Sequence, residues 1–123
     1  MKKKIVICDD ELLILDVLSI ALESDSIEVI STSKSTELIA LIEIAQPDLL
    51  IIDLMMPWLT GDELVRELKT GQQYSHMPII MMSASARAPR VAAECGADAF
   101  LAKPFELDDL YDLVEKVMYA DQT

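Results

Sequence analysis

The sequence predicts an α/β fold in which a five-stranded parallel sheet carries helices on both faces. Along its 123 residues, short apolar runs alternate five times with segments of helical periodicity. Runs such as Leu49–Ile52 place aliphatic side chains at consecutive positions, which is typical of strands buried on both faces of a parallel sheet. Repeated strand–helix alternation predicts right-handed crossovers and a doubly wound sheet.

The first half of the chain is expected to form three strands and two helices. Ile27–Thr32 is short and comparatively polar, which favours an edge position. Pro47 ends the second helix, because proline cannot continue one. One face of that helix collects four apolar residues, Leu38, Leu41, Ile42 and Ala45. In order, the expected elements are a strand over Lys4–Asp9, a helix opened by Asp10 and Glu11 that runs to about Ser24, a strand over Ile27–Thr32, a helix over Thr36–Ala45 and a strand over Leu49–Asp53.

The second half is expected to supply two further strands and three helices. A loop punctuated by Pro57 and Gly61 follows the third strand. Thr60 or Asp62 is a candidate cap for the next helix, and Gly96 stops the helix after that. The expected elements are a helix with Leu64, Val65 and Leu68 turned inward, a strand over Met77–Ser83, a helix over Pro89–Cys95, a strand over Ala99–Ala102 and a last helix whose apolar stripe is Leu107, Leu110, Tyr111, Val114 and Met118.

Composition narrows the possible functions. An apolar fraction of 52% and only 3 glycines exclude a disordered or fibrous chain. The net charge of −12 disfavours direct nucleic-acid binding, which needs a basic surface. No apolar run approaches the roughly 20 residues that span a bilayer, so we expect no membrane partner. Cys8 and Cys95 form no ligand motif and are expected to be reduced and buried, which fits a cytoplasmic protein.

Polar residues stand at the ends of four of the expected strands: Asp9 and Asp10 after the first, Asp53 after the third, Ser83 after the fourth and Lys103 after the fifth. In a doubly wound sheet the first and third strands flank the crevice in which ligands bind. Carboxylates gathered there form a hard oxygen site suited to Mg²⁺. One carboxylate would remain free to attack phosphorus, Lys103 would bind phosphate oxygens and Ser83 would offer a hydroxyl.

Each residue also has an ordinary structural interpretation. An acidic residue after the first strand can cap a helix, and an Asp at a strand end can form a turn. Ser83 and Lys103 are unremarkable when taken singly. His76 lacks ligand partners nearby in the sequence, and Trp58 is equally compatible with partner contact and with a structural role. Only the joint occurrence at four strand ends favours a phosphoryl-transfer site.

In these residues the chain resembles the receiver domain of two-component response regulators. The resemblance runs from Lys4 to about Tyr119, so residues 1–123 are expected to form a single receiver domain. It implies the flavodoxin-like (βα)5 fold with strand order 2-1-3-4-5. The matching segments are Asp9-Asp10, Asp53-Leu54-Met55-Met56-Pro57 with Gly61, Ser83-Ala84, Gly96-Ala97-Asp98 and Phe100-Leu101-Ala102-Lys103-Pro104-Phe105.

The resemblance assigns a role to each residue of the site. Asp53 would be the phosphoacceptor for a histidine kinase's phosphohistidine. Asp10 and Asp53 would bind Mg²⁺ directly, the Met55 backbone carbonyl would be a third ligand, and Asp9 would act largely through water. Lys103 would pair with the phosphoryl group. The family pattern also implies a cis peptide bond between Lys103 and Pro104.

The resemblance further implies a switch and its partners. After phosphorylation Ser83 would move toward the phosphoryl group, Phe100 would turn inward, and the surface of the fourth helix, fifth strand and fifth helix would change. Without the resemblance, Phe100 is equally an ordinary core aromatic. Partners would be a sensor histidine kinase or phosphotransfer protein and a downstream output domain or protein, and phosphorylation-dependent homodimerisation is left open. The protein would catalyse only its own phosphorylation and dephosphorylation, and would not otherwise be an enzyme.

Some features depart from the family pattern or suit other classes. Only 20 positions separate Ser83 from Lys103, about two fewer than usual, and Pro89 falls where the fourth helix should begin, which predicts a short or displaced helix. A haloacid-dehalogenase-like phosphatase would carry its nucleophile after the first strand and an Asp where Met55 stands. A flavodoxin would not place Asp9, Asp10 and Glu11 beside a flavin phosphate. The remaining alternative is an interaction module of receiver fold that works without phosphorylation.

Overall fold

Five parallel strands form one sheet, with helices on both faces. The computed structural model describes residues 2–119; the two ends of the expected 1–123 domain, residue 1 and residues 120–123, lie outside the described residues. The strand order is β2-β1-β3-β4-β5, as the family resemblance implies, and β2 lies at an edge. The elements are β1 Lys3–Cys8, α1 Leu12–Leu22, β2 Ile27–Thr32, a 3-10 turn η1 Ser35–Glu37, α2 Leu38–Ala45, β3 Leu49–Asp53, α3 Gly61–Thr70, β4 Ile79–Ser83, α4 Ala88–Cys95, β5 Ala99–Ala102 and α5 Leu107–Met118.

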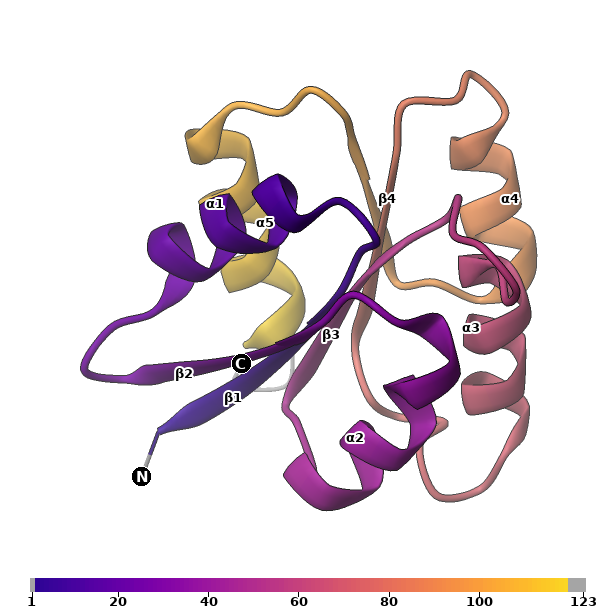
Figure 1. The fold of residues 1–123 in the computed structure, drawn as a ribbon, viewed down its shortest axis with the longest axis horizontal. Helices are drawn as coiled ribbons and strands as arrows, with labels where there is room; N and C mark the ends of the chain where they lie inside the picture. The colour runs from indigo at the N-terminus through magenta and orange to yellow at the C-terminus, as the bar shows by residue number, and fades with distance from the viewer. Residues whose placement is uncertain (1, 120–123) are drawn as a thin grey trace.

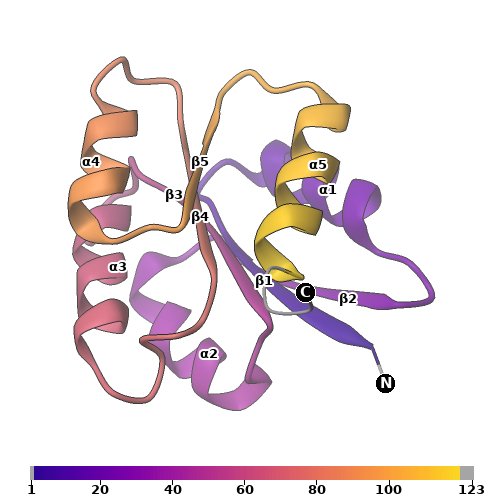
Figure 2. The same ribbon diagram turned by 180° about the vertical axis from the view of Figure 1, so that it is seen from behind.

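The two faces of the sheet bury separate apolar cores. Helices α1 and α5 cover one face, and α2, α3 and α4 cover the other (Figures 1 and 2). Side chains of a strand alternate between the faces, so Ile5 and Ile7 of β1 join the α1–α5 core while Val6 and Cys8 join the other. All five residues of β3 and of β4 are buried. This explains why both strands are nearly free of polar residues until their last position.

Most expected elements are confirmed, with small changes at their ends. The first strand ends at Cys8 rather than Asp9, and α1 begins at Leu12 rather than at Asp10. The fourth strand begins at Ile79, directly after Pro78, which has no N–H to donate to a strand ladder. The short fourth helix is confirmed as α4, and Gly96 ends it in a left-handed conformation with φ 98°.

Two details of the expected helices are wrong. Leu107 and Tyr111 are 45% and 41% exposed, so neither belongs to the buried stripe of α5. The helix buries Leu110, Val114 and Met118, as expected, and packs Leu113 and Val117 beside them, so its apolar face is shifted to one side of the expected stripe. Thr60 occupies the N-cap position of α3, but its side chain makes no capping hydrogen bond.

None of the helices within residues 2–119 combines the length and the apolar character needed to cross a bilayer.

Candidate functional site

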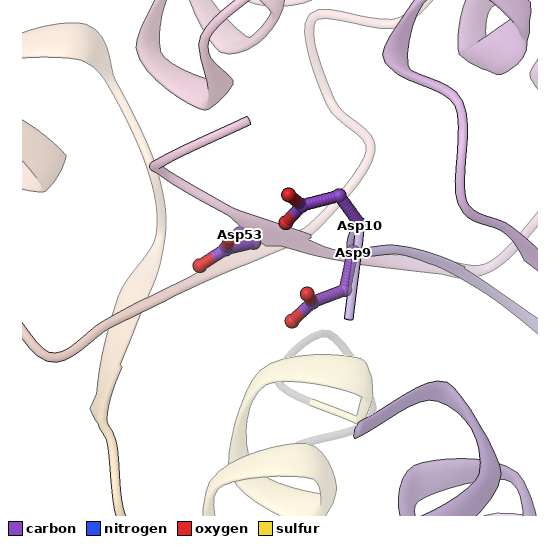
Figure 3. Close-up of side chains that lie close together, drawn as sticks. All are labelled: Asp9, Asp10 and Asp53. Atoms are coloured by element: carbon purple, nitrogen blue, oxygen red, sulfur yellow. The ribbon is translucent and has the colours of Figure 1, made fainter. Parts of the chain in front are cut away.

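Three carboxylates meet at the carboxyl ends of β1 and β3. One oxygen from each of Asp9, Asp10 and Asp53 lies within 4.8 Å of the others (Figure 3). The register pairs Cys8 with Ile52, so the residue after β1 and the last residue of β3 reach the same edge of the sheet. Asp9 is fully buried, Asp53 is 4% exposed, and Asp10 is exposed. Such a concentration of negative charge is relieved by a nearby cation or by a proton.

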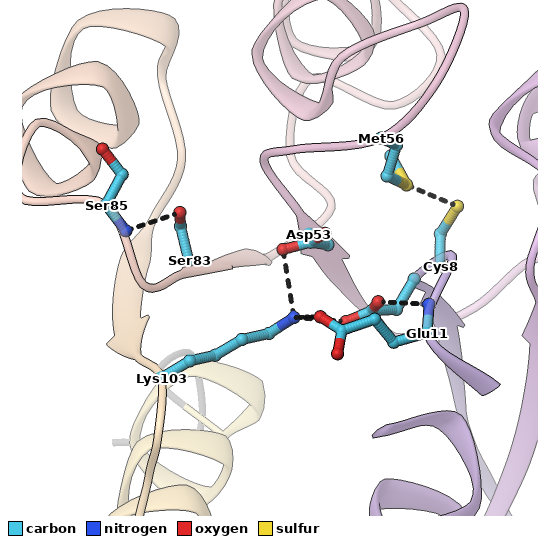
Figure 4. Close-up of polar contacts among 8 residues, drawn as sticks. Cys8, Glu11, Asp53, Met56, Ser83, Ser85 and Lys103 are labelled. Carbon is cyan, nitrogen blue, oxygen red and sulfur yellow. Dashed lines mark hydrogen bonds and ion pairs between the residues drawn. The ribbon is translucent and has the colours of Figure 1, made fainter. Parts of the chain in front are cut away.

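Lys103 provides that cation within the chain. Its Nζ lies 2.8 Å from Asp9 Oδ2, 3.2 Å from Asp53 Oδ1 and 3.3 Å from Glu11 Oε1. Figure 4 shows the lysine reaching across from the end of β5 toward the acidic residues. The Lys103 backbone N–H donates to the Ser83 carbonyl at 3.0 Å, which ties the end of β5 to the end of β4. The Lys103-Pro104 peptide bond is cis, as the family pattern implies.

Both oxygens of Asp9 already have partners within the chain. Oδ1 accepts the Glu11 backbone N–H at 2.9 Å, and Oδ2 accepts from Lys103. The first contact is a local turn that precedes α1. The N-cap residue of α1 is Glu11, whose side chain makes no capping hydrogen bond, so the interpretation of these acidic residues as helix caps is wrong. For the carboxylate of Asp10, no hydrogen bond or ion pair to residues 2–119 is found. The two neighbouring aspartates therefore have different environments.

Burial and mutual repulsion shift the pKa values of the acidic residues upward. For Asp53, desolvation and then the charge of Asp9 raise the pKa from 3.8 to about 6, against the opposing effect of Lys103. Desolvation also raises the pKa of Asp9, although its hydrogen bond to Lys103 acts in the opposite direction. At neutral pH Asp53 is thus mainly ionised, although burial and the charge of Asp9 disfavour the ionised form.

The pKa of Lys103 is also raised, but here the raised pKa favours the charged form. Desolvation alone would lower its pKa, but the hydrogen bond to Asp9 and the charges of Asp9 and Asp53 raise it. Lys103 is therefore protonated at neutral pH. It acts as a fixed positive charge and does not transfer a proton.

A small pocket opens above Asp53. Its volume is about 150 Å³, and its lining includes Met55, Ser83 and Lys103. Met55 is 63% exposed at the rim. Ser83 is buried, and its Oγ accepts the Ser85 backbone N–H at 3.1 Å. A group entering this pocket would meet the carboxylate, the ammonium and the hydroxyl together.

Gly61 allows α3 to begin close to the end of β3. Its N–H donates to the Leu54 carbonyl at 2.9 Å. A Cβ at this position would overlap the Asp53 carbonyl oxygen and lie 2.9 Å from Leu54 Cα. Any larger residue would therefore push the helix away from the strand that carries Asp53.

Cys8 lies next to this site, but its thiol is unreactive. Burial, followed by the charges of Asp9, Asp53 and Asp10, raises the pKa of its thiol to about 12. Its Sγ lies 3.6 Å from Met56 Sδ. The expectation of free, buried cysteines is confirmed for both Cys8 and Cys95, and the protonated Cys8 thiol is no nucleophile.

The structure brings together five of the seven residues singled out from the sequence: Asp9, Asp10, Asp53, Lys103 and Ser83. Met55 is at the rim, and the role of its carbonyl remains a prediction. Phe100 lies apart, half-buried on β5 beside a surface hollow between β5 and α5. His76 and Trp58 are exposed.

Sequence reasoning missed Glu11 and Ser85 as members of this site. Glu11 contacts Lys103 and lines the pocket, and Ser85 lines it and binds Ser83. Their closeness in sequence to Asp9 and Ser83 is the only signal that could have indicated them.

Comparison with known proteins decides the family. The family model of the response regulator receiver domain matches residues 5–115. The chain belongs to the response regulator receiver domain family. Receiver domains are switches of two-component signal transduction rather than classical enzymes, they bind Mg²⁺ at an acidic pocket, and they interact with histidine kinases and output domains.

Curated relatives and solved structures agree with this assignment. The receiver domain is 33% identical over 120 residues to the alkaline phosphatase synthesis transcriptional regulatory protein PhoP of Bacillus subtilis, covering 96% of this chain and 49% of that protein. It is also 33% identical over 118 residues to the phosphate regulon transcriptional regulatory protein PhoB of Pseudomonas aeruginosa, covering 94% of this chain and 52% of that one. The chain thus spans about half the length of these relatives.

Among solved structures, a response regulator from Chloroflexus aurantiacus superimposes with a TM-score of 0.90 at 27% identity, covering 96% of this chain and 98% of that one. The chemotaxis response regulator CheY4 of Vibrio cholerae gives 0.87 at 28% identity, covering 95% and 99%. The fold is therefore that of a receiver domain.

Proposed function

We propose that this receiver domain accepts a phosphoryl group on Asp53 from the phosphohistidine of a sensor histidine kinase or a phosphotransfer protein. The observation that carries the proposal is the convergence of Asp53 with Asp9, Asp10 and Lys103. Asp53 and Lys103 also line one small pocket. In the reaction, an Asp53 carboxylate oxygen forms a bond to phosphorus. The bond from phosphorus to the histidine nitrogen breaks, and its electron pair stays with the imidazole. Water later cleaves the acyl phosphate and returns Asp53 to its free state.

The donor set at the site fits Mg²⁺. Asp10 is exposed and its carboxylate has no partner within residues 2–119, whereas both oxygens of Asp9 are occupied. This difference supports direct binding by Asp10 and Asp53, with the Met55 carbonyl as third ligand and Asp9 acting through water. When bound, Mg²⁺ supplies the positive charge that offsets the carboxylates and the incoming phosphoryl group.

The chain's own groups do the remaining work. The side chain of Asp53 has little conformational freedom, because Asp53 is the last residue of β3 and is only 4% exposed. Lys103 is anchored through Asp9 and reaches Asp53, so it can pair with a phosphoryl oxygen without a large displacement. Phosphoryl transfer depends mainly on such positioning and charge neutralisation.

The switching step would start at Ser83. Its hydroxyl oxygen accepts a backbone N–H from Ser85, which leaves its own O–H free to donate to a phosphoryl oxygen. Movement of Ser83 would allow Phe100 to turn inward and change the α4–β5–α5 surface read by an output partner. Phosphorylation-dependent homodimerisation stays a prediction. A cytoplasmic location is part of the proposal and is supported by the two free thiols.

Incubation with acetyl phosphate and Mg²⁺, followed by intact-protein mass measurement, tests the proposal. Wild-type protein is expected to gain the mass of one phosphoryl group in an acid-labile form, and Asp53→Asn is expected to gain none. Asp25→Asn, which removes an exposed carboxylate between α1 and β2, is the control and should be phosphorylated normally. Absence of any adduct on the folded, Mg²⁺-binding wild type would instead favour an interaction module that works without phosphorylation.

Trp58 offers a second, optical test. The chain has 1 Trp, and Trp58 is 83% exposed on the loop between β3 and α3. Addition of Mg²⁺ or of beryllofluoride, a phosphoryl mimic, is expected to change its emission. An unchanged spectrum at saturating ligand would show that this loop does not respond to the site.

A further inference from the structure

Glu11 shares the ammonium of Lys103 with the two aspartates. The Nζ–Oε1 distance is 3.3 Å, compared with 2.8 Å to Asp9 Oδ2 and 3.2 Å to Asp53 Oδ1. A lysine ammonium has three N–H donors and no acceptor. Hydrogen bonds to Asp9 and Glu11 engage two of them, and the ion pair with Asp53 lies on the remaining side of the ammonium. A phosphoryl oxygen therefore binds Lys103 most readily if one of these carboxylates moves away.

The three carboxylates differ in how easily they can give way. Asp9 is fully buried, and its other oxygen holds the Glu11 backbone N–H. Asp53 is the group that becomes phosphorylated. The side chain of Glu11 is 63% exposed, so water can replace the lysine at little cost. Of the three contacts, the one with Glu11 is the exchangeable one.

We propose that Glu11 is a positioning residue that holds the Lys103 ammonium at the mouth of the pocket until a phosphoryl group takes its place. The proposal rests on the proposed function of Asp53. The backbone of residue 11 stays fixed through Asp9 during the exchange, so only the glutamate side chain has to move. Because the Glu11–Lys103 contact is lost when phosphoryl binds, it lowers the affinity of the site for that group.

Removing the charge of Glu11 should therefore improve phosphoryl binding. For Glu11→Gln, the apparent affinity for beryllofluoride at saturating Mg²⁺ is expected to rise about two- to fivefold, the range of a partly exposed ion pair. Glu43→Gln removes the same charge from an exposed position on α2 and should leave the affinity unchanged. An unchanged or weaker affinity in Glu11→Gln would overturn the proposal.

Nuclear magnetic resonance of the lysine ammonium groups separates the direct contact from simple charge repulsion. The Lys103 signal is assigned by its loss in Lys103→Arg. Without ligand, Glu11→Gln is expected to shift this signal and to accelerate exchange of its protons with water, whereas Glu43→Gln should do neither. With beryllofluoride and Mg²⁺ bound, the Lys103 signals of wild type and Glu11→Gln should become alike, because the mimic has replaced Glu11.

Two contrary results have different meanings. The proposal is wrong if the ligand-free Lys103 signal is insensitive to Glu11→Gln, because Glu11 then does not contact the lysine. It is also wrong if the two proteins still differ with the mimic bound, because the mimic then has not replaced Glu11. If the wild type binds no beryllofluoride at all, the proposed function of Asp53 is wrong. The proposed replacement of Glu11 by a phosphoryl group at Lys103 is then wrong as well.

Discussion

Lys103 and Lys69 are partly buried lysines at opposite ends of the sheet, and of these two Lys103 alone lies in the candidate reactive site. Lys103, 12% exposed, stands at the carboxyl ends of the strands, and Lys69, 15% exposed, stands at the amino ends of β4 and β5. Lys69 Nζ binds Asp98 Oδ2 at 2.8 Å and the carbonyls of Met77 and Ser75 at 2.8 and 3.4 Å. The same Asp98 oxygen accepts the Ile79 backbone N–H at 2.8 Å.

The difference between the two lysines lies in charge balance. Lys69 faces one carboxylate, and neutral carbonyls take its remaining donors. Lys103 faces three carboxylates, and Asp10 adds a fourth nearby. An ammonium paired with one carboxylate is electrically neutral and needs no further ion. A cluster with more carboxylates than ammonium groups keeps a net negative charge, and binding of a proton or a metal ion reduces its internal repulsion. Surplus charge, rather than burial of a lysine, thus distinguishes the reactive end of the sheet from the structural end.

The largest expected effect comes from deleting each lysine in turn. Lys103→Met leaves Asp9 and Asp53 buried without their cation, which should lower the free energy of unfolding by about 3 kcal/mol. Lys69→Met leaves fewer charges unpaired and should cost about 1–3 kcal/mol. Urea denaturation with and without Mg²⁺ distinguishes them: Mg²⁺ should restore much of the stability of Lys103→Met and none of that of Lys69→Met. An equal response of both variants to Mg²⁺ would contradict the comparison.

Removing surplus charge should stabilise the protein in a pH-dependent way. The pKa of Asp53 rises from 3.8 to about 6 on folding, so the native state holds this proton more tightly than the unfolded state. Its stability cost is absent below about pH 4, grows through pH 4–6 and is complete above the folded pKa. Asp53→Asn lacks this cost. At pH 7 without divalent ions, its free energy of unfolding should therefore exceed that of wild type by on the order of 2–3 kcal/mol.

Urea denaturation from pH 4 to pH 7 measures this effect. The advantage of Asp53→Asn over wild type should increase across that range and shrink again when Mg²⁺ is added. Asp25→Asn is the control, with no such trend expected. A difference between Asp53→Asn and wild type that is constant with pH would show that Asp53 carries no such cost.

The two ends of α3 extend the comparison to packing. Gly61 borders the site, where a Cβ would collide with the Asp53 backbone, and Gly71 stands at the far end, where a Cβ would lie 3.4 Å from the Glu67 carbonyl oxygen. Gly61→Ala should cost about 1–3 kcal/mol through overpacking and weaken Mg²⁺ binding by displacing Asp53. Gly71→Ala should change stability by less than about 0.5 kcal/mol. Thermal unfolding and Mg²⁺ titration of both variants provide the measurement.

The smallest expected effect belongs to an exposed ion pair. Arg90 Nε and Glu94 Oε1 lie 2.9 Å apart on α4, with side chains 87% and 54% exposed. Glu94→Gln should cost only about 0.3–0.5 kcal/mol and should be insensitive to Mg²⁺. A loss comparable to that of Lys69→Met would mean that burial does not separate these pairs.

The sequence predicted the site well because its residues follow strands that are easy to recognise. β3 and the predicted Asp53 position agree with the structure, since an uninterrupted aliphatic run has few other solutions. The parallel arrangement then places Asp9, Asp10, Ser83 and Lys103 at the same edge. Glu11 could not be found in this way, because its contact with Lys103 spans 92 positions and depends on the path of two loops.

Helix faces were harder to predict than strands. In α1 only Asp16 and Ser19 interrupt the apolar residues from Leu12 to Leu22, so periodicity alone cannot select the buried side. The structure buries Leu15, Leu18 and Leu22 and leaves Leu13 and Ile20 exposed. In α5 charged residues do mark the exposed side, but the seven apolar positions form a wider stripe than the helix buries, and Leu107 and Tyr111 at its margin were placed wrongly.

The amino-acid sequence is sufficient to predict the five-stranded α/β fold and the types of residue at the strand ends, because the period of apolar residues is a local property of the chain. The three-dimensional arrangement sets which carboxylates share Lys103, how deeply Asp9 and Asp53 are buried, and which lysine has partners that balance its charge. These properties depend on distances of a few ångströms between segments far apart in the chain, and Coulomb energies and desolvation depend on just those distances.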